Sequence, residues 1–99
     1  MTSHHDSIQR FAQRLEDLDY KLDRLESRLQ DLGGEVRERA AEKLARLKAV
    51  GLALRQREQA IKDASEAALH ELEAGAEEAW STAKVLFEDL SIDMKVEGL

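Results

Sequence analysis

The chain has 99 residues, of which 36% are charged, 42% hydrophobic and 4% aromatic, and it contains neither cysteine nor proline. This length allows a single domain with a thin core. The absence of cysteine excludes disulfides, thiol catalysis and cysteine-ligated zinc or iron–sulfur sites. The absence of proline, together with only five glycines, favours long helices.

The net charge of −6 is unevenly distributed along the chain. Residues 1–34 carry −2, residues 35–62 carry +4 and residues 63–99 carry −8. A basic middle segment next to a strongly acidic end favours folding of the end back onto the middle. The acidic total argues against nucleic acid and anionic membranes as partners. The start shows no signal-peptide pattern and no apolar run is long enough to cross a membrane, so we expect a cytoplasmic protein.

The first predicted helix spans residues 8–32. Its apolar residues step alternately by three and four positions, which is the narrow seam of a coiled coil. They are Ile8, Phe11, Leu15, Leu18, Leu22, Leu25, Leu29 and Leu32. Gly33 and Gly34 follow and predict a break, although one continuous helix with a tolerated glycine pair is the alternative.

The second predicted helix spans residues 35–62 and has a weaker apolar stripe, because Gly51 and Glu58 fall on seam positions. A second break is predicted near residues 62–66. Asp63 and Glu66 there have the spacing of a capping box, and Ser65 is the alternative cap. One continuous helix is the alternative here too, because no glycine or proline enforces the break.

The third predicted helix spans residues 66–92, with a broad apolar stripe that suits packing against two neighbours. We expect flexible ends at residues 1–7 and 95–99, and one helical domain over residues 8–94. The fold class is therefore all-α, either an antiparallel coiled-coil-like hairpin or a three-helix bundle.

Two groups of residues are candidate metal ligands. If Met1 is removed, Thr2, Ser3 and His4 would offer the N-terminal amine, two amides and an imidazole, a square-planar set that selects Cu(II) or Ni(II). An unstructured start with incidental histidines is the alternative. Spacings of four, three and four residues also place a second set on one helix face, where a solvated acidic surface is the alternative: Glu66, His70, Glu73 and Glu77.

A candidate partner-binding face lies on the third helix and consists of Trp80, Ala83, Phe87 and Leu90. Core packing of the same residues is the other interpretation. Elsewhere the sequence has no phosphate-binding glycine loop and no local nucleophile signature, so we expect neither an enzyme nor a bound cofactor.

The stretch from Leu69 to Trp80 reads Leu-His-Glu-Leu-Glu-Ala-Gly-Ala-Glu-Glu-Ala-Trp. Together with the heptads from Leu15 through Leu29, it resembles the short bacterial coiled-coil-domain, or stress-response-associated, proteins. The resemblance covers about residues 11–90. It implies a small cytoplasmic helical hairpin without enzyme activity, produced under stress.

These patterns together predict a non-enzymatic protein that acts by helix-to-helix packing, as a homodimer or with a protein partner. Two other functions are left open. One is Cu(II) or Ni(II) binding at the N-terminus, and the other is protection of exposed apolar surfaces by an amphipathic helix.

Overall fold

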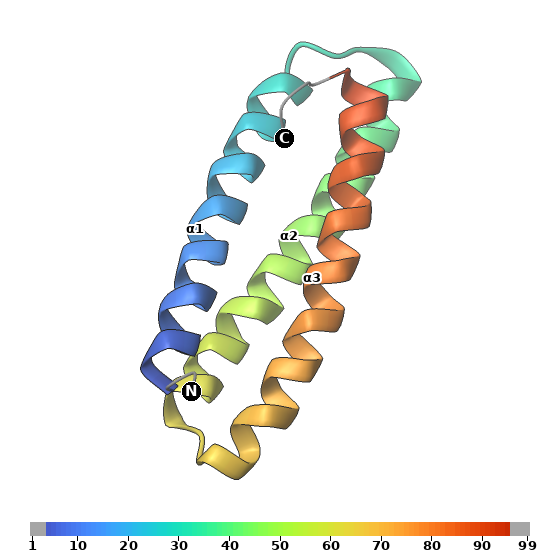
Figure 1. Ribbon diagram of the computed structural model, residues 1–99. Coiled ribbons are helices and arrows are strands. Elements are labelled where there is room, and N and C mark those ends of the chain that lie inside the picture. Colours follow the sequence, from blue (N-terminus) through green and yellow to red (C-terminus); the bar gives the residue numbers. More distant parts are fainter. Residues whose placement is uncertain (1–3, 96–99) are drawn as a thin grey trace.

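The computed structural model describes residues 4–95, which form three long helices: α1 (His4–Leu29), α2 (Gly34–Asp63) and α3 (Glu66–Met94). Successive helices are antiparallel, and α2 runs between α1 and α3 (Figure 1). The three-helix bundle measures 49 × 19 × 17 Å. The predicted all-α class is confirmed, and the three-helix arrangement is the one adopted. Across residues 4–95, no helix has an apolar stretch of the length and purity that a bilayer crossing needs.

The turn between α1 and α2 depends on glycine. After Leu29 the chain turns through two backbone hydrogen bonds, Asp31 N–H to the Arg28 carbonyl at 3.0 Å and Leu32 N–H to the Leu29 carbonyl at 3.1 Å. Gly34 then adopts a φ of +65°, a conformation that side chains with a Cβ disfavour. The break predicted at the glycine pair is therefore present, and it separates two helices.

The helix bounds differ slightly from those predicted. α1 begins at His4, four residues before the predicted start, and ends at Leu29 instead of residue 32. Asp6 in the first turn favours an earlier start, since its negative charge complements the helix dipole. The turn between α2 and α3 is short. Ser65 is its cap and accepts a hydrogen bond from Ala68 N–H at 3.3 Å, as one of the two sequence alternatives predicted.

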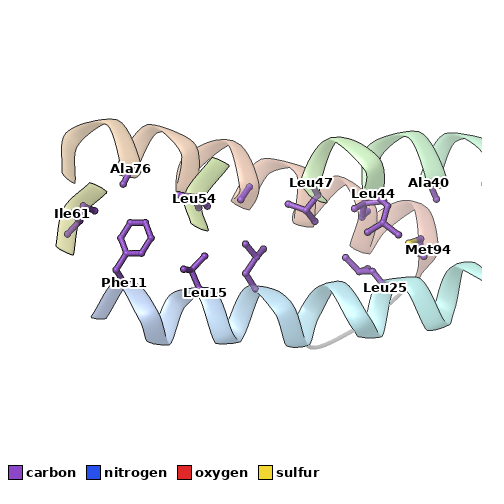
Figure 2. Packing of buried hydrophobic residues seen from close by; sticks show 13 residues of the cluster. Phe11, Leu15, Leu25, Ala40, Leu44, Leu47, Leu54, Ile61, Ala76 and Met94 are labelled. Atoms are coloured by element: carbon purple, nitrogen blue, oxygen red, sulfur yellow. The ribbon is translucent and has the colours of Figure 1, made fainter. Parts of the chain in front are cut away.

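The core lies where the three helices face one another. Figure 2 shows Phe11 of α1 pointing toward Ile61 of α2 and Ala76 of α3 at one end of the bundle. At the other end, Leu25 lies near Met94 (Figure 2). The largest fully buried side chains are spread along all three helices: Leu25, Leu47, Leu54, Ile61, Leu90 and Met94.

The basic middle segment receives acidic partners from both sides. Lys48 of α2 pairs with Glu26 of α1, and Lys43 of α2 lies 2.6 Å from the Asp93 carboxylate of α3. Arg55 of α2 pairs with Asp19 of α1, whose hydrogen bond and negative charge raise the pKa of Arg55 above its ordinary value. Each exposed pair contributes less than about 1 kcal/mol, so these contacts orient the helices more than they hold them together.

Candidate functional site

A long groove runs between α1 and α3. These two helices run in the same direction on either side of α2, and the contact between them is much smaller than the contact that either makes with α2. The groove has a volume of about 1440 Å³ and is open along one side. Small-molecule pockets typically occupy about 300–1,000 Å³ and enclose most of the ligand. The size and openness of this site, called the α1/α3 groove below, suit an elongated partner better than a small ligand.

Aromatic and small apolar residues form the inner surface of the α1/α3 groove. Phe11 contributes from α1, while Trp80, Ala83 and Phe87 contribute from α3. The Phe11 and Trp80 rings meet edge to face, with centroids 5.7 Å apart. Trp80 and Phe87 are half-buried against the core, so each ring has one side packed and one side toward the groove.

The structure places the four predicted partner-binding residues at different depths. Trp80 and Phe87 line the α1/α3 groove and are half-buried against the core. Ala83 also lines the groove but is only 2% exposed. Leu90 is fully buried in the core and does not line the groove.

Basic side chains of α1 cross to α3 at seven-residue intervals. The Arg14 guanidinium lies 4.8 Å from the centroid of the Trp80 ring, and Lys21 Nζ lies 5.5 Å from that of Phe87. One heptad further along, Arg28 donates a hydrogen bond to the main-chain carbonyl of Met94 at 3.2 Å. Arg14, Lys21 and Arg28, called the cation series below, therefore join α1 to α3. An apolar seam would be expected at this place in a helical bundle.

The first of these contacts is also an ion pair. Arg14 Nη1 lies 2.5 Å from Glu77 Oε1, and both side chains are largely exposed, at 47% and 63%. Beside this pair the Trp80 Nε1–H is buried and has no hydrogen-bond acceptor within residues 4–95. A buried N–H without an acceptor costs about 1–3 kcal/mol, so the surroundings of Trp80 are not those of an optimised closed core.

Of the two sets of candidate metal ligands, the described residues lie at the start of α1 and along α3. Thr2 and Ser3 lie outside the described residues, and His4 is the first residue of α1. In the part of the chain that the structure describes, no three histidine, aspartate or glutamate side chains gather closely enough to hold an ion. His70, Glu73 and Glu77 instead lie along the α3 side of the groove.

The cation series is the structural feature of the groove that the sequence analysis does not predict. Its signal is present in the sequence as basic residues at positions 14, 21 and 28, matched by aromatic residues at 80 and 87. The order of the contacts, Arg14 with Trp80 and Lys21 with Phe87, shows that α1 and α3 run in the same direction with a constant offset.

No protein-family model, curated protein or solved structure matches this chain.

Proposed function

We propose that this protein is a non-enzymatic helical interaction protein, and that the α1/α3 groove receives the apolar side of another helix. The observation that carries this proposal is the half-burial of Trp80 and Phe87 on the inner surface of an open groove. Aromatic side chains with one packed and one accessible side are typical anchors of helix-in-groove recognition.

The arrangement of the three helices supports a helical occupant. An α-helix with its side chains is about 10–12 Å across and packs about 8–10 Å from its neighbours. The α1/α3 groove extends from Ser7 to Lys21 on α1 and from His70 to Ile92 on α3, which corresponds to several helical turns. A helix lying in this groove would complete a four-helix arrangement and cover the aromatic rings.

The cation series makes the groove adaptable. Arg14 and Lys21 cover the aromatic rings through contacts worth about 0.5–1 kcal/mol each at exposed sites. An occupant that buries more apolar area on the same rings can displace them, while their aliphatic stems still pack beside it.

A role in stress, and a cytoplasmic location, are proposed from the family resemblance.

The fluorescence of Trp80 tests this function, since it is the single tryptophan of the chain. The probe is a designed amphipathic peptide of three heptads, with leucine at both seam positions, glutamate along one flank and lysine along the other. In a solution dilute enough for the chain to be monomeric, we expect the peptide to reduce acrylamide quenching of Trp80 in a saturable way, because it covers the ring.

A pair of neighbouring residues provides the control. Ser81 lines the α1/α3 groove, whereas the next residue, Thr82, does not. Ser81→Arg should block protection of Trp80 by the peptide, and Thr82→Arg should leave it unchanged. Equal protection in both variants, or none in the unmodified protein, would overturn the proposed function.

A further inference from the structure

The α1 wall of the groove is basic. Arg10, Arg14 and Lys21 line it, with Asp17 as the single acidic side chain among the charged residues on this wall. Arg14 and Lys21 extend over the aromatic rings of α3. The charges of this wall therefore stand at the rim of the apolar surface, where they can meet an incoming partner.

The α3 wall is acidic. Glu73, Glu77 and Glu88 line it, and Lys84 is the basic exception. With histidine neutral, the two walls carry equal and opposite charge, so the groove is balanced overall in a chain of net charge −6. Two copies of an acidic chain repel each other overall, and a side of balanced charge lowers that repulsion at the interface.

Resting on the proposed function, we propose that the α1/α3 groove is covered by the same side of a second copy of this chain, whose α1 and α3 supply the apolar helical surface. The two copies are related by a twofold axis that runs along the helices. This rotation places α1 of one copy opposite α3 of the other, so each basic wall faces an acidic wall. The interface is isologous and closes with two chains.

The charges select this axis over the other way of joining two grooves. A twofold axis perpendicular to the helices would place α1 against α1 and α3 against α3, which brings walls of like charge together. An axis along the helices keeps the heights of residues equal in both copies. Since Arg14 and Glu77 lie at one height within a chain, Arg14 of one copy is level with Glu77 of the other.

The apolar surface provides most of the binding energy in this dimer. Exposed ion pairs each contribute little to binding, whereas the contribution of apolar burial grows in proportion to the area removed from water. Covering Trp80 and Phe87 from a second copy removes apolar area from water on both sides of the axis. The walls then determine which orientation of the two copies is allowed.

Charge reversal of one wall at a time tests the proposal. One variant makes the α1 wall acidic, with Arg10→Glu, Arg14→Glu and Lys21→Glu. The other makes the α3 wall basic, with Glu73→Lys, Glu77→Lys and Glu88→Lys. Sedimentation should show the unmodified 11.2 kDa chain as a dimer. Each variant alone should associate roughly 100-fold more weakly, and an equal mixture of the two should form the dimer again.

Matched variants reverse as many charges outside the groove. Arg37, Arg39 and Arg46 to Glu is the counterpart on α2, and Glu71, Glu78 and Asp89 to Lys is the counterpart on α3. These should remain dimeric. Circular dichroism checks that every variant keeps its helices. A monomeric unmodified chain, or equal effects inside and outside the groove, would overturn the proposal.

Cross-linking gives a measurement that does not depend on the charge variants. The chain has no cysteine, so Gln13→Cys on α1 and Ser81→Cys on α3 each introduce a unique thiol in the groove. In a mixture, a short bismaleimide should join the two variants to each other faster than it joins either to itself. Preferential joining of like variants would contradict the proposed axis.

Self-association and helix binding can fail separately. If the designed peptide protects Trp80 while the unmodified chain sediments as a monomer, the groove binds helices but not a second copy, and only the dimer is overturned. If the chain is dimeric but the groove variants stay dimeric, its interface lies elsewhere and the dimer through the groove is again overturned.

Discussion

The sides of α2 that pack on its neighbours and the α1/α3 groove are built differently. Leu47 and Leu54 of α2 are fully buried, and Leu18 of α1 packs on Gly51, where an added Cβ would lie 3.3 Å from its side chain. Across the groove, α1 reaches α3 through cations over half-buried rings. The difference indicates that the apolar seams with α2 provide most of the stability of the fold, whereas charged side chains cover the sides of α1 and α3 that face the groove.

The largest expected effect concerns the buried seams between α2 and its two neighbours. Leu54→Ala should lower the free energy of unfolding by about 3 kcal/mol, because it leaves a cavity at a fully buried position in the middle helix. Leu52→Ala is the control on the same helix, since Leu52 is 59% exposed, and it should cost well under about 1 kcal/mol. Urea unfolding followed by circular dichroism measures both. Equal losses would contradict the assignment of Leu54 to the core.

A smaller effect is expected on the groove side. Phe87→Ala should cost about 2 kcal/mol, roughly half the loss typical of a fully buried phenylalanine, because one side of its ring faces the groove. The same variant should weaken peptide protection of Trp80 while the chain stays folded. A loss as large as that of Leu54→Ala would show that Phe87 acts as an ordinary core residue.

The cation series should contribute less to the free energy of unfolding than Phe87 does. Arg14→Gln removes both the ion pair with Glu77 and the contact over Trp80, at an expected cost of about 1 kcal/mol in low salt. Added salt should shrink the difference, since it screens exposed charges. Arg10 lines the same wall and forms no ion pair with any residue in 4–95. Arg10→Gln should therefore change the free energy of unfolding less than Arg14→Gln does. Identical losses would remove the special role of Arg14.

The smallest expected effect is a gain. Gly75→Ala should raise the free energy of unfolding by about 0.5 kcal/mol, because alanine is more stable than glycine in the interior of a helix. The added Cβ would lie 2.5 Å from Arg57 Nη1, the end of a flexible side chain that can move away. Gly51→Ala should gain less, since the Leu18 side chain is packed there. A larger gain at Gly51 would mean that α1 and α2 pack less closely than described.

Much of this fold follows from local sequence signals. The alternating steps from Phe11 to Leu25 place one narrow apolar stripe on α1, and the positive φ of Gly34 explains why the turn into α2 contains a glycine. Ser65 marks the second turn by its capping oxygen. Helix ends were harder to place, because the turn hydrogen bonds of residues 29–32 compete closely with one more helical turn.

The candidate site was only partly predictable. The aromatic pair Trp80 and Phe87 is evident from spacing, but its half-burial depends on how far α1 stands from α3, which no local pattern specifies. Leu90 shares their stripe yet is fully buried in the core. A stripe wider than one seam shows that a helix has two neighbours, and it does not show which neighbour is close.

The central place of α2 also bears on how quickly the chain folds. Most packing joins helices that follow one another in sequence, whereas the contact between the first and third helices is slight. Contacts between residues close in sequence cost little loop-closure entropy before they form. Helical bundles, which are rich in such contacts, fold in about microseconds to milliseconds. Either hairpin can form first and serve as a template for the remaining helix. An open groove thus leaves the chain with few slow, long-range contacts to make.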